Sequence, residues 1–232
     1  MTLKLGMPSK GRLMDKTFDW FAARGIEMER TGSDREYAAR VNGADIELVL
    51  LSASEIPREL QAGRIHLGVT GSDLVREKIP MWEQVVAELE PLGFGFANLM
   101  IAVPKAWIDV DTLDDLDAVA SDFRARHGMR LRIATKYHRL VRDFLRDYGV
   151  ADYQLVDSQG ATEGAVKNQT VEAIADITST GETLRANHLK GLDDGLIHRS
   201  QAVLFKSRAA HWSDVERAAL TSLSVQLDLD LA

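Results

Sequence analysis

The sequence predicts an α/β fold of two lobes with a ligand cleft between them. The chain repeats one construction, in which a short apolar strand is followed by small polar residues and then by a helix. This alternation is typical of βαβ units with a parallel sheet, where ligands bind at the carboxyl ends of the strands. The chain has 232 residues. That length suits one large domain or two lobes of about 100 residues each.

The first lobe begins with the apolar strand Leu3–Met7, followed by a helix that opens at Pro8–Arg12 and runs to about Arg24. Further apolar runs, bounded by small polar residues, predict more strands. These predicted strands are Ile26–Arg30, Tyr37–Val41, Ala44–Leu51, Ile65–Val69, Val85–Leu92 and Phe96–Val103.

Pro104 follows an apolar run and precedes an aspartate-rich segment, so we place the crossing to the second lobe there. The strand–helix pattern then restarts, with strands predicted at Leu131–Ala134, Tyr153–Val156 and in the run that leads to Thr178. The apolar stretch Leu196–Phe205 is expected to return to the first lobe, where Ser213 caps a last helix. The predicted lobes are therefore residues 1–103 with 196–232, and residues 104–195.

The composition excludes several classes of protein. The absence of cysteine excludes disulfides, thiolate zinc sites and cysteine nucleophiles. A net charge of −7 argues against a broad nucleic-acid-binding face. No apolar run approaches the ~20 residues that a transmembrane helix needs, and the amino terminus lacks the pattern of a signal peptide. We therefore expect a cytoplasmic protein with no nucleic-acid or membrane partner.

Val171–Asn187 is the most informative segment. An apolar run with two acids, Glu172 and Asp176, leads into the turn Ser179–Thr183 and then into a helix-like segment. Strand, small polar turn and helix start can bind phosphate, because unpaired backbone N–H groups and the positive end of the helix dipole face the anion. The two acids are four residues apart and fall on one side of a strand or a helix. We expect the turn to bind the phosphate of a phosphosugar and the carboxylates to bind its hydroxyls.

The same turn has a second interpretation that needs no ligand. Ser179 and Glu182 have the spacing of a capping box, and the two interpretations are compatible. The rest of the chain favours a ligand, because several strand-to-helix junctions are expected to face the cleft. These junctions follow Met7, Val69, Ala134, Val156 and Thr178.

Four cations are candidates for anion contacts. Lys10 and Arg12 stand at a helix start, where positive charge opposes the helix dipole, which suggests that an anion binds between them. Lys136 follows another predicted strand, and Arg35 stands in a polar loop. The alternative for each is a solvated side chain or a surface ion pair with an acidic neighbour.

Other catalytic motifs are missing from the sequence. It has no His-Glu-x-x-His or Gly-x-Ser-x-Gly segment, so zinc-protease and serine-hydrolase activities lack support. His66 and His198 lie in apolar runs and are better interpreted as hydrogen-bonded core or interface histidines than as catalysts.

The segments described so far resemble ATP phosphoribosyltransferase, the first enzyme of histidine biosynthesis. Val171–Leu189 matches that family's motif at Glu172, Asp176-Ile177 and Ser179-Thr180-Gly181-Glu182-Thr183-Leu184. Further matches follow in the family's order over about residues 3–207. They are Pro8–Leu13, Gly68–Leu74, Ala102–Pro104, Ala134–Tyr137 and Gly160–Glu163.

The resemblance implies a periplasmic-binding-protein-like fold of type II and a pentosyl transfer. N1 of the adenine of ATP would attack C1 of phosphoribosyl pyrophosphate, giving phosphoribosyl-ATP and pyrophosphate. Mg²⁺ would be the cofactor, held mainly by pyrophosphate, with no protein ligand assigned. Because adenine N1 is unprotonated at neutral pH, catalysis would rest on positioning and electrostatics, with Lys10 and Arg35 as the candidate residues.

The resemblance also implies two sets of binding residues. Those for phosphoribosyl pyrophosphate are Glu163, Glu172, Asp176, Ser179, Thr180, Gly181, Glu182 and Thr183. Those for ATP and pyrophosphate are Lys10, Gly11, Arg12, Arg35, Gly71, Asp73 and Lys136.

The chain departs from the family pattern at several positions. Ser52 stands where the family has an arginine, so Arg58 or Arg35 would have to supply that anion contact. His66 and Glu172 each stand where the family has an aspartate. None of these changes removes the phosphate-binding turn.

The resemblance is to the family's short form, because only 25 residues follow Ser207. This form works with a histidyl-tRNA-synthetase-like regulatory subunit, in which feedback by histidine would reside. A homodimer of this chain within a hetero-octamer is the expected assembly. The alternative function, from a different class, is a two-lobed solute-binding module without catalytic activity.

Overall fold

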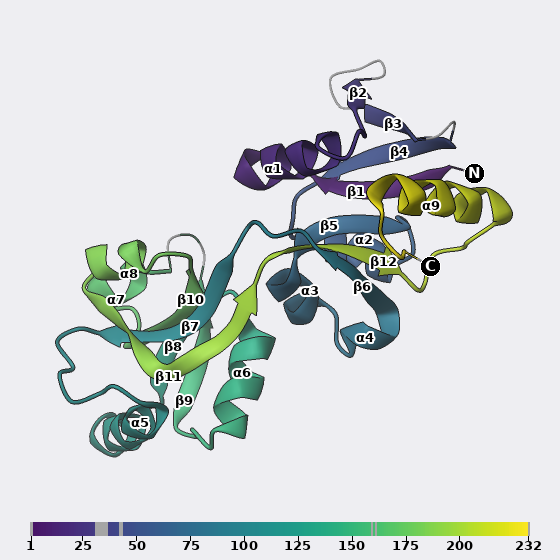
Figure 1. Ribbon diagram of the computed structural model, residues 1–232. Coiled ribbons are helices and arrows are strands. Elements are labelled where there is room, and N and C mark those ends of the chain that lie inside the picture. Colours follow the sequence, from purple (N-terminus) through teal and green to yellow (C-terminus); the bar gives the residue numbers. More distant parts are fainter. Residues whose placement is uncertain (1, 31–36, 42–43, 159, 161, 232) are drawn as a thin grey trace. The chain divides into compact units, whose positions relative to one another are not determined.

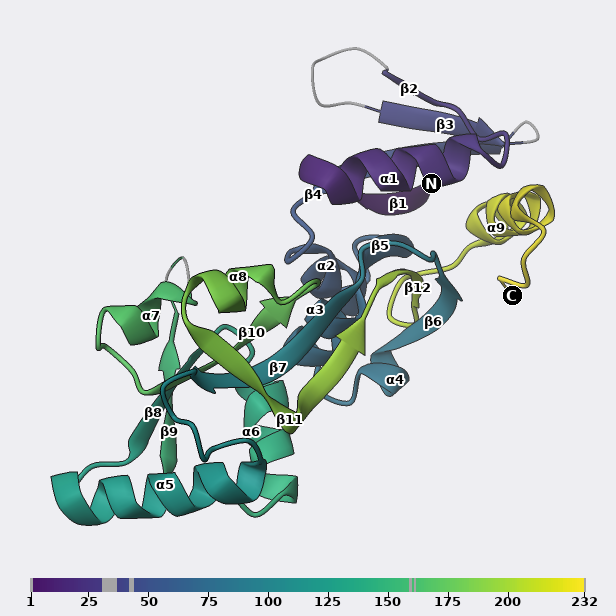
Figure 2. The same cartoon turned by 60° about the vertical axis from the view of Figure 1, so that its left-hand side comes forward.

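The computed structural model describes residues 2–30, 37–41, 44–158, 160 and 162–231. The chain divides into two compact units, Met1–Gly95 with Gln201–Ala232, and Phe96–Ser200. Each unit has its own mixed β-sheet with helices on both faces (Figure 1; Figure 2). This is the α/β architecture that the alternating pattern predicts.

The first unit is built on a sheet of seven strands. The strands are β1 (Leu3–Pro8), β2 (Met28–Arg30), β3 (Tyr37–Val41), β4 (Ala44–Leu51), β5 (Leu67–Gly71), β6 (Val86–Pro91) and β12 (Ala202–Ser207). Their order is β2-β3-β4-β1-β5-β12-β6. β1 is parallel to its neighbours β4 and β5, and the other described pairs are antiparallel. The carboxyl ends of β1, β4 and β5 therefore lie at one edge.

Helices cover both faces of this sheet. They are α1 (Gly11–Ala22), α2 (Ile56–Gln61), α3 (Ser72–Lys78), α4 (Trp82–Val85) and α9 (Asp214–Leu227). Phe21 of α1 and Leu223 of α9 pack in one buried cluster with Leu5 of β1. Leu60 of α2 packs with Phe205 of β12 in a second cluster. Successive residues of a strand point to opposite faces, so one sheet supplies both cores.

The second unit has five strands in the order β11-β7-β10-β8-β9. The strands are β7 (Ala97–Pro104), β8 (Leu131–Thr135), β9 (Tyr153–Asp157), β10 (Ala173–Thr178) and β11 (Leu189–Ser200). β10, β8 and β9 are parallel, and β7 is antiparallel to β10 and β11. The helices are α5 (Leu113–His127), α6 (His138–Asp147), α7 (Gly164–Lys167) and α8 (Glu182–Ala186). Two views place α5 and α6 on one face and α7 and α8 on the other (Figure 1; Figure 2).

The two units divide at 95/96 and 200/201, whereas the sequence placed the crossings at 103/104 and 195/196. β7 and β11 account for this difference. They pair with each other from Leu189↔Pro104 to Ser200↔Ala97, so both strands belong to the second sheet along their whole length. An apolar run shows that a strand is buried, but it does not show which sheet buries it.

The strand-to-helix junctions agree with the sequence prediction within two residues. The strands concerned end at Pro8, Gly71, Thr135, Asp157 and Thr178. Ser213 is the N-cap of α9, as predicted, and forms a capping box with Glu216. No helix among the described residues is long and apolar enough to cross a membrane.

Gly63 and Gly128 permit a matched test of packing against backbone strain. Both have φ +67, and both follow the last turn of a helix. A Cβ at Gly63 would lie 2.6 Å from the Ala209 carbonyl oxygen, whereas a Cβ at Gly128 would meet nothing within 4 Å. Gly128→Ala therefore introduces only the strain of a positive φ, and Gly63→Ala adds a collision with backbone.

We expect Gly63→Ala to lower the free energy of unfolding by about 1–3 kcal/mol more than Gly128→Ala does. Urea denaturation followed by circular dichroism measures the difference. Equal losses in the two variants would contradict the close contact at Ala209.

Candidate functional site

The parallel strands of the second unit bring several predicted site residues to one edge. Thr135, at the end of β8, lies opposite Ala175 of β10 and opposite Asp157 of β9. The chain segments that leave these three strands are therefore neighbours, since parallel strands end at the same side of a sheet. We call this side of the second unit the β10 edge.

Asp176 lies at the centre of the β10 edge. It is half-buried, and its Oδ1 accepts the Ile177 N–H at 2.8 Å. Burial raises the pKa of the Asp176 carboxyl above its ordinary value of 3.8, although hydrogen bonds from Ile177 and Thr162 and the charge of Lys136 oppose the shift. Glu163 adds a smaller effect in the same direction as burial. Asp176 is thus a carboxylate whose charge is only partly compensated within the protein.

The turn after β10 is built around a left-handed glycine. Gly181 is the N-cap of α8 with φ 73, and its N–H donates to Thr178 Oγ1 at 2.9 Å. The first backbone hydrogen bond of α8 is donated by the Arg185 N–H to the Gly181 carbonyl. The N–H groups of Thr183 and Leu184 come earlier in the chain and have no acceptor within the helix. The turn is exposed at Ser179, Thr180 and Thr183. Its backbone donors are accessible to an anion.

The capping-box interpretation of this turn is wrong. Gly181 rather than Ser179 is the N-cap, and no side chain caps α8. Thr180 Oγ1 instead accepts the Glu182 N–H at 3.3 Å. The spacing of Ser179 and Glu182 fits a capping box, but Gly181 in the left-handed region starts the helix two residues later.

Lys136 and the segment after β9 complete the β10 edge. Lys136 Nζ donates to the Gly160 carbonyl at 2.6 Å. Ser158 Oγ and Thr162 Oγ1 lie 2.8 Å apart, and Thr162 is fully buried. Glu163, which the sequence assigned to phosphoribosyl pyrophosphate, is the N-cap of α7 in the same segment.

Sequence reasoning did not assign Ser158, Thr162 or Thr178 to the site. The available signal was the run of small polar residues after the strand that ends at Asp157. The sequence does not show that Thr162 reaches Asp176, because this contact joins the turn after β9 to a different strand, β10.

Glu172 does not lie with Asp176 at the β10 edge. It precedes the first residue of β10, and its carboxylate accepts from the Arg132 N–H at 2.8 Å and from two nitrogens of the Arg132 side chain at 3.1 and 2.5 Å. Residues four apart on a strand share a face, as predicted, but they are separated by about 13 Å. Glu172 is therefore bound to Arg132 near the amino end of β10, apart from Asp176.

Five of the seven residues predicted for ATP and pyrophosphate are described in the first unit, whereas Lys136 lies at the β10 edge of the second unit. Lys10, Gly11 and Arg12 are exposed at the start of α1, directly after β1. Gly71 ends β5 and is the N-cap of α3, and Asp73 is buried in the first turn of that helix. The Ser9 N–H donates to Leu51 O at 2.7 Å, and Thr70 Oγ1 donates to Ala53 O at 2.7 Å, so the loops after the parallel strands are bonded together. We call this side of the first unit the β1 edge.

Arg35 lies outside the described residues. The Ser52 hydroxyl and the Ser52 N–H both donate to Glu55 Oε2, at 2.7 and 3.0 Å. The loop after β4 is therefore held by hydrogen bonds between its own residues. Beside this loop is a cavity of about 370 Å³ with Arg58 and Lys78 in its wall. Arg58 is therefore a described cation beside the loop that holds Ser52, where the family has an arginine.

His66 is a hydrogen-bonded core histidine, which confirms its interpretation from the sequence. Its Nδ1 accepts the Lys4 N–H at 3.0 Å, so Nε2 carries the proton and donates to His211 O at 3.1 Å. The ring packs edge-on against Trp212. Both nitrogens are engaged, and neither is available to a substrate.

Comparisons of the sequence with known proteins find a matching family and a relative similar over the whole chain. The model of the family described as HisG, ATP phosphoribosyltransferase, matches residues 52–228. An ATP phosphoribosyltransferase from Cereibacter sphaeroides is 71% identical over 232 residues, which is 100% of this chain and 98% of the relative.

Two solved structures share the fold. The ATP phosphoribosyl transferase (HisG:HisZ) complex from Thermotoga maritima has a TM-score of 0.72 at 22% identity and covers 98% of this chain and 96% of its own. A probable amino-acid ABC transporter extracellular-binding protein from Bacillus subtilis has a TM-score of 0.55 at 11% identity, with 98% and 90% coverage. These likenesses confirm the periplasmic-binding-protein-like architecture of type II.

The contact between Glu172 and Arg132 predicts a pH-dependent contribution to stability. Burial alone would raise the pKa of Glu172, but the hydrogen bonds and charge of Arg132 outweigh it, so the pKa is lowered from its ordinary value of 4.5. The ionised carboxylate therefore stabilises the fold at neutral pH, and this contribution is lost as the pH falls through the lowered pKa.

We expect Glu172→Gln to lower the free energy of unfolding by about 1–3 kcal/mol at pH 7. The difference from the unsubstituted protein should shrink as the pH falls below 4.5, and chemical denaturation at several pH values measures it. A difference that does not depend on pH would show that the ion pair does not supply this stability.

Proposed function

The chain belongs to the ATP phosphoribosyltransferase family, and from this premise we propose that the β10 edge binds phosphoribosyl pyrophosphate. The protein transfers the 5-phosphoribosyl group to N1 of ATP, the first step of histidine biosynthesis. The observation that supports the assignment is the arrangement of Lys136, Thr162 and Asp176 beside the exposed turn after β10.

The turn from Ser179 to Thr183 binds the 5-phosphate in this proposal. Its accessible amides and the positively charged Lys136 supply hydrogen bonds and charge to an anion. Asp176 accepts hydrogen bonds from the ribose hydroxyls, because its carboxyl oxygens are only partly satisfied within the protein. Glu163 lies close enough to influence the same carboxylate and belongs to this set. Glu172 positions the start of β10 through Arg132.

ATP and the leaving pyrophosphate are assigned to the β1 edge. Lys10 and Arg12 are exposed there, and no ion pair involves either residue within the described parts of the chain. The backbone at Gly71 and the first turn of α3 lie at the same edge. Two cations at a helix start are repelled by the positive end of the helix dipole, unless an anion lies between them.

Electrostatic stabilisation and positioning are the catalytic effects that these residues supply. Adenine N1 is unprotonated at neutral pH, so the reaction needs no strong general base. Negative charge develops on pyrophosphate as its bond to C1 breaks, and the cations Lys10 and Arg12 favour that charge. Positive charge develops at the ribosyl centre, which the carboxylate of Asp176 favours.

Mg²⁺ is the cofactor that fits this chemistry. Among the described residues, no three His, Asp or Glu side chains form a cluster that would hold a metal. Mg²⁺ commonly binds through substrate phosphates and one or two carboxylates. Asp176 and Glu163 are the candidates to hold it in this chain, and the ion would neutralise part of the pyrophosphate charge.

A regulatory subunit is the proposed partner. The Thermotoga maritima structure is a complex of HisG with HisZ, and its HisG-type fold matches this chain. We infer that this chain also assembles with a histidyl-tRNA-synthetase-like subunit, as homodimers within a hetero-octamer, and that ATP and phosphoribosyl pyrophosphate meet it in the cytoplasm.

The purified chain, mixed with a HisZ-type subunit, ATP, phosphoribosyl pyrophosphate and Mg²⁺, should accumulate phosphoribosyl-ATP. Absorbance of the product measures the rate. Histidine should inhibit the mixture but leave any activity of the isolated chain unchanged. Absence of product in the mixture would refute the assignment of substrates, and inhibition of the isolated chain would refute the location of regulation in the partner.

Asp176→Asn separates substrate binding from stability. The pKa of Asp176 is raised in the folded state, so ionisation above pH 3.8 disfavours folding, and the neutral amide should keep or increase the free energy of unfolding at pH 7. The KM for phosphoribosyl pyrophosphate should rise about 10- to 100-fold, which corresponds to the loss of charged hydrogen bonds.

Steady-state kinetics and thermal unfolding measure the two effects. Glu172→Gln is the matched control, since it also neutralises one acid of the same motif. It should lower stability and leave the KM nearly unchanged. The opposite pattern in the two variants would contradict the assignment of Asp176 to the substrate.

A further inference from the structure

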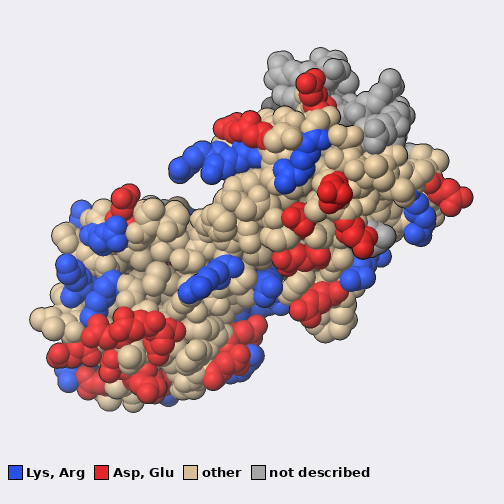
Figure 3. Space-filling model, viewed as in Figure 1, with Lys and Arg blue, Asp and Glu red and all other residues tan. Residues whose placement is uncertain are grey.

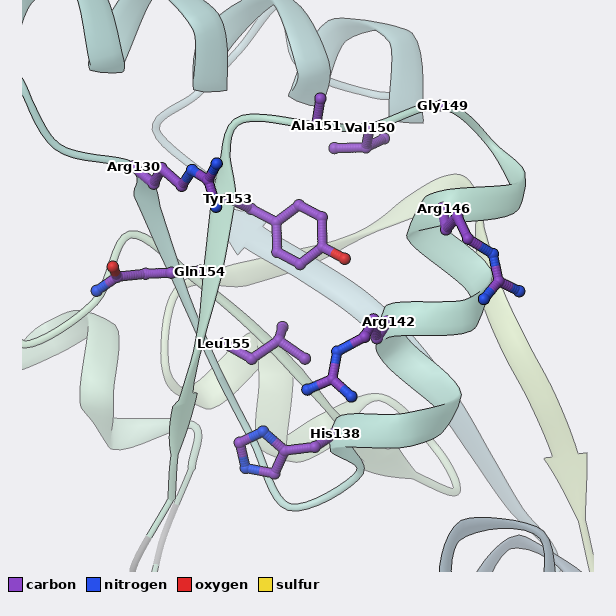
Figure 4. Close-up of a pocket in the computed structure, with 10 residues that line it drawn as sticks. All are labelled: Arg130, His138, Arg142, Arg146, Gly149, Val150, Ala151, Tyr153, Gln154 and Leu155. Carbon is purple, nitrogen blue, oxygen red and sulfur yellow. The ribbon is translucent and has the colours of Figure 1, made fainter. Parts of the chain in front are cut away.

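A second concave surface of the second unit lies between α6 and β9, away from the exposed turn after β10. It is a cavity of about 620 Å³. Figure 4 shows Arg142 and His138 on the α6 side, and Tyr153 and Leu155 on the β9 side, with Arg130 beside them. Cavities of about 300–1,000 Å³ are typical of sites for small molecules.

Three arginines gather at this cavity. Arg142 and Arg146 are one helical turn apart on α6, and Arg130 precedes β8. Arg146 pairs with Asp143 at 2.9 Å and with Asp147 at 3.0 Å. Arg130 and Arg142 have no ion pair with any described residue. Arg146 is therefore already neutralised within α6, and Arg130 and Arg142 are the two arginines available to an anion.

Tyr153 is the neutral donor of the cavity. Burial, with a smaller contribution from the charge of Asp143, raises the pKa of its phenol above the ordinary value of 10.0, against the opposing charges of Arg142, Arg146 and Arg130. The hydroxyl therefore keeps its proton at neutral pH and can donate a hydrogen bond. All three guanidinium groups lie close enough to this one hydroxyl to act on it. The Tyr153 ring and Leu155 supply an apolar wall beside these donors.

The alternative is that these arginines are only a solvated basic surface. The overall charge argues against this, because the chain has a net charge of −7. Acidic side chains gather elsewhere on the same unit, over the α5 end in Figure 3. A purely solvated basic surface would require neither a concave shape nor a half-buried tyrosine beside the arginines, and this surface has both.

We propose that the cavity between α6 and β9 binds a compact small-molecule polyanion, either a phosphate ester or a di- or tricarboxylate. Arg130 and Arg142 bind its charged oxygens through their planar guanidinium groups, which match phosphate and carboxylate geometry. The Tyr153 hydroxyl donates a further hydrogen bond. The part of the cavity that binds the anion is additional to the substrate sites, since Arg130 precedes β8 and Tyr153 begins β9, whereas the β10 edge is formed where these strands end. Of the described lining residues, only His138, which lies 3.4 Å from Asp157, extends the cavity lining toward that edge.

Isothermal titration calorimetry of the full chain with inorganic phosphate, and separately with citrate, tests the proposal. Arg142→Ala should weaken binding of at least one anion about tenfold or more, the loss expected for a charged hydrogen-bonding partner. Tyr153→Phe should weaken the same anion by a smaller factor. The anion that responds identifies the ligand as a phosphate or a carboxylate.

Arg126→Ala is the matched control. Arg126 is an exposed arginine on α5 that pairs with Asp122 at 2.9 Å, so its loss changes the net charge by the same amount. It should leave both titrations unchanged. Asp176→Asn alters the β10 edge and should leave the Arg142-dependent binding unchanged, which keeps this test independent of the proposed substrate site.

Two results would overturn the proposal. One is binding of both anions with the same affinity in Arg142→Ala and in the unsubstituted protein. The other is an equal loss in Arg126→Ala, which would indicate a response to net charge alone. Thermal unfolding of each variant, with midpoints near that of the unsubstituted protein, ensures that folded proteins are compared.

Discussion

The register of β8 with its two parallel neighbours is the constraint on which the candidate substrate site depends. Thr135 is fully buried between Ala175 and Asp157. Its carbonyl accepts the Ser158 N–H, and its hydroxyl accepts the Tyr137 N–H. These two hydrogen bonds fix the chain where it leaves β8 and β9, at the same end of the sheet. A shift of register by one residue would turn every side chain of a strand to the opposite face, and would take Asp176 away from Thr162 and Lys136.

The acids of the β10 motif show how position along a strand decides the role of a charge. Asp176 lies near the carboxyl end, where burial is only partly offset and the carboxylate is available to a ligand. Glu172 lies before the first residue of the same strand, where Arg132 binds both of its oxygens. The first charge opposes folding, and in the proposed function it binds the ribose hydroxyls. The second stabilises the fold.

The arginines of the second unit divide in the same way. Arg132 is bound by an acid within the sheet, and Arg124 pairs with Asp152. Arg142 lies on a concave surface and forms no ion pair with a described residue. An unpaired cation beside a half-buried phenol and an apolar wall is suited to an anionic ligand rather than to the stability of the fold. This contrast supports a second binding site in the same unit.

The sequence by itself determined the α/β class, the positions of the strand-to-helix junctions and the position of the turn after β10. These features depend on local patterns, namely apolar periodicity, small polar residues at strand ends and a glycine at position 181. It also singled out Lys136 and Asp176, which the structure brings to the same edge of the second sheet. Only the tertiary structure decided that β7 and β11 belong to one sheet, that Thr162 meets Asp176, and that Glu172 belongs to Arg132. Each of these is a contact between segments far apart in the chain, and the spacing of residues within one segment does not specify it.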